Sequence, residues 1–164
     1  MNDRTIFFSD SSFDPGSKSG VAGFLMVRES DVADSPRQAP SVQTSVILGT
    51  TCSRLEVESV LVVLHRIREL SLAGQAVIYT DCKTVVELPG RRIRLESGGY
   101  VGKSSGKILA NADLYKIFFS LIDELSPVFI WIKGHRETRL NDNFDNLFSI
   151  VDKSTRKELR KIIG

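Results

Sequence analysis

Thr5-Ile6-Phe7-Phe8-Ser9-Asp10 is a short apolar run that closes on a carboxylate. A second run, Val77-Ile78-Tyr79-Thr80-Asp81, has the same form. Short runs rich in β-branched and aromatic residues predict buried strands, so each aspartate is expected where a strand ends. In open α/β sheets, ligands bind beyond the carboxyl ends of the strands. Asp10 and Asp81 are therefore candidate residues of a site.

The rest of the chain predicts further strands and helices in a mixed order. Strands are expected at 20–28, 42–50 and 128–133, and helices at 53–72, from Asp81 to Pro89, at 111–125 and from Asn141 or Asp142 onward. Residues 29–41 are expected to form a polar connection. This order predicts an α/β fold: a five-stranded mixed sheet with helices on both faces. A right-handed crossover can place the fourth strand beside the first.

Glu56 is a third candidate residue, on the predicted helix 53–72. Ser53 could cap this helix, and Glu56 follows three residues later, so the pair fits a capping box. Glu56 also shares a helical face with Val60 and Val63. A carboxylate on an apolar face is costly unless it is paired or binds a metal, which favours a role in a site over a cap alone.

Asp145, on the predicted C-terminal helix, completes a set of four carboxylates with Asp10, Glu56 and Asp81. Four oxygen ligands from four segments suit Mg²⁺ or Mn²⁺ better than zinc. Divalent ions held by carboxylates serve phosphoryl chemistry. The pattern therefore indicates a metal-dependent reaction at a phosphate group.

Composition sets limits on the kind of protein. A length of 164 residues predicts one domain over 1–164, and a hydrophobic content of 41% supports a core of ordinary size. The net charge is only +2, so affinity for nucleic acid must come from local patches. No apolar run approaches a membrane span, and the first residues lack the apolar region of a signal peptide. Cys52 and Cys82 have no metal-ligand spacing, so a reduced cytoplasmic setting is expected.

Residues 91–107 are basic, and we expect them to be irregular. Glycines and one aromatic residue, Tyr100, are spread through this segment, and a single acidic residue, Glu96, opposes its cations. The cations are Arg91, Arg92, Arg94, Lys103 and Lys107. Such a segment is either a solvated loop or a phosphate-binding handle with one aromatic platform.

Five short motifs, in order and at fitting distances, resemble the type 1 ribonuclease H family over nearly the whole chain. The motifs are Ser9-Asp10-Ser11-Ser12, Thr50-Thr51-Cys52-Ser53-Arg54-Leu55-Glu56, Tyr79-Thr80-Asp81-Cys82-Lys83, Trp131-Ile132-Lys133-Gly134-His135 and Asn141-Asp142-Asn143-Phe144-Asp145. Asn111 and the residues after it are similar to the helix that follows the family's basic handle. The resemblance implies the ribonuclease H-like fold.

The resemblance also implies an activity: hydrolysis of the RNA strand of RNA–DNA hybrids with two Mg²⁺ ions, for which Mn²⁺ can substitute. Asp10 would contact both ions, and Glu56, Asp81 and Asp145 would complete the ligands. His135 matches a histidine that is thought to help protonation or product release. The expected partner is nucleic acid, with no membrane, and the expected state is a monomer.

Substrate-binding positions also follow from the resemblance. They are Ser11, Ser12, Thr51, Ser53, Lys83, Arg91, Arg92, Arg94, Tyr100, Lys103 and Asn141. The chain departs from the family pattern at several of them. Ser11 replaces a glycine, and Cys52-Ser53 replaces an asparagine pair that helps to read RNA 2′-hydroxyls. Lys83 stands where a glutamine is common. These departures leave the strictness of hybrid specificity open.

Three other functions are alternatives to this one. The same fold could cleave other structured DNA or RNA. Ser53 and Lys83 are the residues that would distinguish this hypothesis from cleavage of RNA–DNA hybrids. A non-catalytic nucleic-acid-binding module would have lost a carboxylate. A general α/β domain with surface acids leaves Glu56 on an apolar face unexplained. Cys52 and Cys82 could pair on oxidation, although two inert buried thiols are the favoured interpretation.

Overall fold

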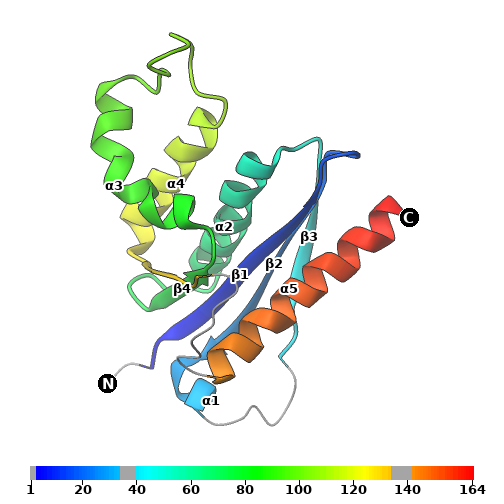
Figure 1. The fold of residues 1–164 in the computed structure, drawn as a ribbon. Coiled ribbons are helices and arrows are strands. Elements are labelled where there is room, and N and C mark those ends of the chain that lie inside the picture. Colours follow the sequence, from blue (N-terminus) through cyan, green and yellow to red (C-terminus); the bar gives the residue numbers. More distant parts are fainter. Residues whose placement is uncertain (1–2, 34–39, 134–141) are drawn as a thin grey trace.

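A mixed sheet of five strands lies between two layers of helices in the computed structural model, which describes residues 3–33, 40–133 and 142–164 (Figure 1). The strands are β1 (Thr5–Asp14), β2 (Ser19–Arg28), β3 (Gln43–Leu48), β4 (Ala76–Thr80) and β5 (Val128–Trp131). Their order in the sheet is β3-β2-β1-β4-β5. β1, β2 and β3 are antiparallel neighbours, whereas β4 runs parallel to β1 and β5. The predicted placement of the fourth strand beside the first is confirmed.

The two helical layers follow from the alternation of side chains along a strand. Phe7 of β1 packs in a core with residues of α2 (Cys52–Glu69), α3 (Lys83–Ser97) and α4 (Ala112–Leu125). Its neighbours Ile6 and Phe8 point to the other face, where they pack against α5 (Asp142–Ile163) and the short α1 (Glu29–Ala33). Helices therefore cover both faces, as the sequence predicts (Figure 1).

Asp10 does not close its strand, which corrects the sequence-based expectation. β1 continues to Asp14 because it stays paired with β2 in a long hairpin. β4 is the strand that stops: its last residue, Thr80, pairs with Ser9. Asp10 and Asp81 therefore both follow the last parallel pair, and they lie at the same edge although only Asp81 follows a strand end.

Pro89 does not end its helix. α3 runs from Lys83 to Ser97 and buries Val85, Leu88 and Leu95 against the core. This burial outweighs the backbone hydrogen bond that a proline removes from a helix interior. The first part of the basic segment is consequently helical and carries Arg91, Arg92 and Arg94, so the prediction of an irregular segment over 91–107 is wrong as far as Ser97.

Tyr100 is not an exposed aromatic platform. Its side chain packs in the core beside α4 and is only 8% exposed. The backbone of Tyr100 has a φ of 59°, a left-handed turn after α3 that directs the ring inward. The ammonium group of Lys116 lies 5.1 Å from the ring centre. The ring is therefore unavailable for stacking on a nucleic-acid base.

The predicted connection 29–41 and the last helix touch near their starts. The predicted polar connection 29–41 begins with a helix, α1, and the backbone carbonyl of Val32 in it accepts a hydrogen bond of 2.9 Å from Asn143 Nδ2. The last helix begins at Asp142, one of the two predicted starts. None of the helices in the described ranges is long and apolar enough to cross a membrane.

Candidate active site

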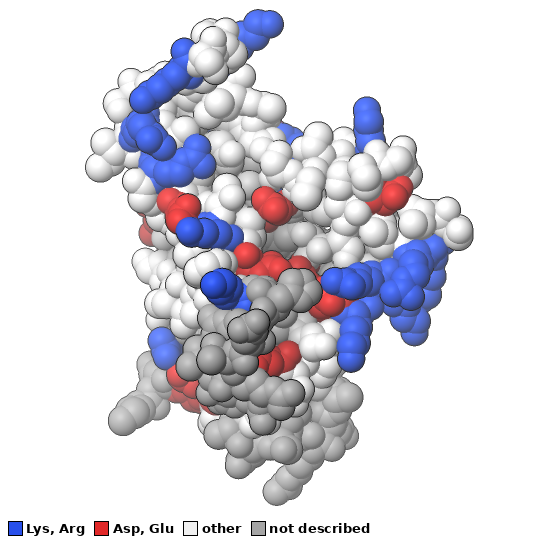
Figure 2. All heavy atoms as spheres, viewed as in Figure 1, with Lys and Arg blue, Asp and Glu red and all other residues white. Residues whose placement is uncertain are grey.

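Asp10, Glu56 and Asp81 line one open cavity of about 310 Å³. The three carboxylates come from β1, from α2 and from the residue after β4. Ser9, Ser11, Cys52, Cys82 and several apolar side chains complete the lining. Acidic side chains gather near the middle of the face seen in Figure 2, with basic side chains to either side. Three of the four predicted metal ligands are thus together.

The turn after β4 holds Asp81 at the cavity. Thr80 Oγ1 accepts a hydrogen bond of 3.1 Å from the backbone N–H of Cys82. On the other side, the indole N–H of Trp131 donates to the backbone carbonyl of Asp81 at 3.1 Å. Both bonds fix the backbone and leave the side chain of Asp81 exposed toward solvent.

The pKa of Asp10 is raised by its surroundings. Burial, and then the charge of Asp81, raise the pKa of Asp10 to about 8. A hydrogen bond of 2.8 Å from the backbone N–H of Ser11 opposes the rise, and Asp152 adds to it. Acids that repel one another in a partly buried site favour either a bound proton or a bound cation. Asp10 is thus the carboxyl group of the cavity whose pKa rises most clearly, through burial first and neighbouring acids second.

The capping explanation of Glu56 is wrong. The N-cap of α2 is Thr51, whose hydroxyl accepts a hydrogen bond of 3.2 Å from the backbone N–H of Arg54. Ser53 is therefore inside the helix, and Glu56 lies beyond the position that a capping box requires. Glu56 is half-buried on the inward side of α2, so the cavity is the feature that explains it.

Cys82 lines the same cavity as Glu56. Burial raises the pKa of the Cys82 thiol to about 12, and the nearby carboxylates add to the effect. The thiol is therefore neutral at physiological pH, and the charge of Glu56 is one of the smaller causes of this shift. Cys52 is exposed, which corrects the expectation of two buried thiols, and both thiols are free.

Asp145 is described on α5 as a half-buried residue but does not line the cavity. The α5 carboxylate that acts on Asp10 is Asp152, two turns later. Asp152 also accepts a hydrogen bond of 3.0 Å from Arg156. In the ranges 3–33, 40–133 and 142–164, no three His, Cys, Asp or Glu side chains are arranged to hold one ion. Convergence of all four predicted carboxylates stays a prediction.

Asp152 is a neighbour of Asp10 that the sequence motifs did not indicate. It lies seven residues after Asp145, on the same helical side. Next to it, the hydroxyls of Thr155 and Ser12 are 2.9 Å apart, so this part of α5 touches β1 close to Asp10. The periodicity of α5 was a usable signal, but only the position of the helix on the sheet distinguishes the two aspartates.

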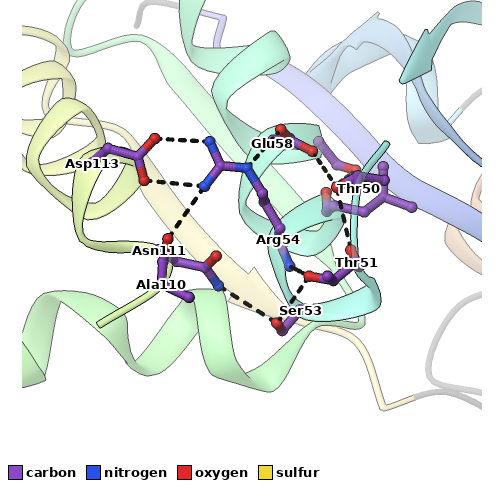
Figure 3. A network of polar contacts seen from close by, with 10 residues as sticks. Thr50, Thr51, Ser53, Arg54, Glu58, Ala110, Asn111 and Asp113 are labelled. Carbon is purple, nitrogen blue, oxygen red and sulfur yellow. Dashed lines mark hydrogen bonds and ion pairs between the residues drawn. The ribbon is translucent and has the colours of Figure 1, made fainter. Parts of the chain in front are cut away.

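A polar network anchors the start of α2, which carries Glu56 (Figure 3). Arg54 donates two hydrogen bonds to Asp113 of α4, at 3.0 and 2.8 Å, and forms an ion pair of 3.3 Å with Glu58. Arg54 lowers the pKa of Asp113 to about 2. Glu58 in turn accepts a hydrogen bond of 2.9 Å from Thr50. The network joins α2 to α4 and to the segment after β3.

The predicted substrate-binding residues near the cavity have different surroundings. Ser11 lines the cavity, whereas the hydroxyl of Ser12 faces Thr155. Thr51 and Ser53 are exposed at the start of α2, where their hydroxyls are 3.4 Å apart. The ammonium group of Lys83 lies over the ring of Trp131.

The cations of the basic segment divide into two groups. Arg92 has a structural role: it forms ion pairs with Glu96 and Asp123 at 2.8 and 2.6 Å, and its guanidinium lies over the ring of Phe119. Arg94 and Lys103 are exposed, and Arg91 is half-buried. His135 and Asn141 lie outside the described residues.

Three comparisons place this geometry among known proteins. The model of the RNase H family matches residues 2–151. A structure of the prototype foamy virus protease-reverse transcriptase superposes with a TM-score of 0.69 at 16% identity, covering 94% of this chain and 20% of that one. The chain therefore spans a fifth of the length of the viral protein. Curated proteins contain no match to the sequence.

A second solved structure matches over its whole length. LC11-RNase H1, isolated from compost by a metagenomic approach, superposes with a TM-score of 0.61 at 14% identity, covering 96% of this chain and 99% of that one. The same enzyme in complex with RNA/DNA hybrid superposes with a TM-score of 0.57 at 14% identity, covering 95% and 99%. At these identities the likeness shows the shared fold.

Proposed function

This chain belongs to the ribonuclease H family, and we propose that it is an endonuclease that hydrolyses the RNA strand of RNA–DNA hybrids with two divalent metal ions. One observation carries the proposal: Asp10, Glu56 and Asp81 reach a single cavity from three separate elements. The complexes of LC11-RNase H1 and of the foamy virus enzyme with RNA/DNA hybrid support the choice of substrate.

The chemistry of the donor atoms suits hard divalent cations. The donors are carboxylate oxygens, which Mg²⁺ and Mn²⁺ prefer, and the raised pKa of Asp10 is the mark of repulsion that a cation relieves. Asp10, Glu56 and Asp81 would hold the ions, with a carboxylate of α5, Asp145 or Asp152, completing the set. Bound Mg²⁺ supplies a water of lowered pKa and stabilises charge on the leaving oxygen.

The protein's own groups orient these acids. The backbone N–H of Ser11 holds one oxygen of Asp10, and the neutral thiol of Cys82 lines the same cavity as Glu56. Ser53, at an asparagine position of the family motif, is a hydroxyl that can both donate to and accept from an RNA 2′-hydroxyl. Exposed cations such as Arg94 would contact phosphates. By the same resemblance, we propose that His135 carries a proton at the reacting phosphate.

A direct test compares three labelled duplexes: RNA–DNA hybrid, double-stranded RNA and double-stranded DNA. In Mg²⁺ the RNA strand of the hybrid should be cut, and EDTA should abolish the cutting. Asp81→Asn should remove activity, because an amide keeps the shape but loses the charge that binds a cation. The matched control Asp31→Asn changes an exposed aspartate of α1 and should cut normally.

The outcomes separate the alternatives. Cleavage of one of the other duplexes in place of the hybrid would replace the proposed substrate while keeping the nuclease. Tight binding of all three duplexes without cleavage in Mg²⁺ or Mn²⁺ would indicate a binding module. Undiminished cleavage in EDTA would contradict the metal-dependent reaction itself.

A further inference from the structure

The C-terminal half of α5 carries a basic face that the site does not use. This face, called here the α5 basic face, consists of Lys153, Arg156, Lys157, Arg160 and Lys161, all exposed. The opposite side of the same helix packs on the sheet through Leu147, Val151, Thr155 and Leu159, all buried. At 100° per residue, the cations and the buried residues lie on opposite sides of the helix.

Three of these five cations have no ion-pair or hydrogen-bond partner among the residues that the structure describes. Arg156 pairs with Asp152 at 3.0 Å, and Lys161 pairs with Glu158 at 2.8 Å. For Lys153, Lys157 and Arg160, no ion pair or hydrogen bond of the side chain occurs in the described part of the chain. The basic residues in the last turn are favoured by the helix dipole, but that effect falls off within one turn. The helix dipole therefore does not explain why Lys153 and Lys157 are basic.

The α5 basic face begins beside the cavity. Asp152 acts on Asp10 and also holds Arg156, so the first basic turn follows directly from the site. In Figure 2 a basic cluster lies on one side of the central acidic region, and more basic side chains lie on the other. The family model matches only as far as residue 151, so these cations belong to the part of the chain beyond the match.

We propose that the α5 basic face binds the phosphate backbone of the duplex on one side of the cleavage site. The inference rests on the proposed function in taking that duplex to be an RNA–DNA hybrid. Lys153 and Arg160 are seven residues apart, about 10 Å along the helix axis. Phosphates of one strand are spaced about 3.4 Å along a duplex, so the row can contact about three of them.

The contact should be electrostatic and independent of sequence. Exposed lysine and arginine side chains without a fixed fork geometry neutralise phosphates and do not read base edges. Each phosphate contact contributes about 0.9 to the slope of log K against log salt concentration. The affinity added by the α5 basic face should therefore decline as salt is raised.

The test is the double variant Lys157→Gln/Arg160→Gln against the control Arg28→Gln/Arg68→Gln. Both lose two positive charges. Arg28 is five strand residues from the partner of Asp10, about 17 Å, and Arg68 is twelve helix residues from Glu56, about 18 Å. Binding of a fluorescent RNA–DNA hybrid is measured by anisotropy in EDTA over a salt series, and circular dichroism checks that each variant is folded.

The first double variant should lose about 1.8 from the salt slope, and the control should keep the slope of the unaltered protein. Lys153→Gln, alone, should lose about 0.9 and serves as a second test if the double variant unfolds.

Equal slopes for the double variant and the unaltered protein would overturn the proposal. So would binding of anionic lipid vesicles, but of no duplex, through these residues. The same measurements with double-stranded DNA and double-stranded RNA separate this proposal from the proposed function. If the variant changes the slope on one of those duplexes and the hybrid is not cleaved, the α5 basic face binds phosphates but the proposed substrate is wrong. If the hybrid is cleaved and the slopes do not change, the proposed substrate is supported but the α5 basic face does not bind it.

Discussion

Replacing Asp10 with asparagine should stabilise the metal-free protein, although it removes a predicted metal ligand. The pKa of Asp10 is raised from 3.8 to about 8, first by burial and then by Asp81. Below pH 3.8 the folded and unfolded states both hold the proton, and nothing is lost. Between the two values only the folded state holds it, so the free energy of unfolding falls as pH rises. Above pH 8 the loss is complete.

The size of the effect follows from the shift. Each pH unit between the two values costs about 1.4 kcal/mol, so the loss at pH 7 is about 4 kcal/mol. A domain's total stability is only about 5 to 15 kcal/mol. Asparagine keeps an oxygen for the N–H of Ser11 and has no charge to desolvate. The variant Asp10→Asn should therefore melt about 10 °C higher than the unaltered protein at pH 7.

Urea or thermal unfolding in EDTA, from about pH 4 to about pH 8.5, is the assay. The stability gap between Asp10→Asn and the unaltered protein should be near zero at the acid end and widen with pH. Asp14→Asn, on the same strand, is the matched control. Hydrogen bonds from Ser17 lower the pKa of Asp14, so its contribution is present above pH 3.8 and lost as the pH falls. That variant should show no gain that grows with pH.

The reasoning fails if the curves of Asp10→Asn and the unaltered protein run parallel across this pH range, because a parallel offset contains no titration. A second check uses Mg²⁺. An ion that binds only the folded state stabilises it by mass action. Mg²⁺ should raise the stability of the unaltered protein and leave Asp10→Asn nearly unchanged, so the gap should narrow.

The remaining predictions concern the surroundings of the site. Arg54→Ala should lower the free energy of unfolding by about 1 kcal/mol in urea titrations, because it removes the link to α4. Arg92→Gln should lower the melting temperature, whereas Arg94→Gln should leave it unchanged and reduce the salt slope of hybrid binding by about 0.9. Asp152→Asn should move the titration of Asp10 to lower pH, as seen in the pH dependence of unfolding.

The sheet could be predicted from the sequence because local and topological rules agree. The runs at 5–10 and 77–81 have the composition of strands. A right-handed crossover places the strand at 77–81 beside the strand at 5–10, as the structure has it. The position of Glu56 followed from helical periodicity, since a carboxylate on an apolar face needs a partner. These signals depend on neighbours in sequence or on one rule of handedness.

The predictions of the end of α3, the exposure of Tyr100 and the end of β1 were wrong because tertiary packing outweighs local sequence preference there. Pro89 predicts a helix end, but the buried Leu88 and Leu95 hold α3 together across it. Tyr100 stands among glycines and cations, a polar context that gives no sign of a left-handed turn into the core. The end of β1 could not be read from Asp10, because strand pairing with β2 decides it.

The approach of Asp152 to Asp10 depends on a feature of the neighbouring strand. Gly23 is the β2 residue paired with Asp10. A Cβ atom on Gly23 would lie 2.5 Å from a methyl group of Thr155, so only glycine lets α5 come this close to the sheet. A glycine inside a strand often marks a close approach of another element. Once that contact is made, helix geometry places Asp152, one turn before Thr155, beside the cavity, and Asp145 two turns further along the axis.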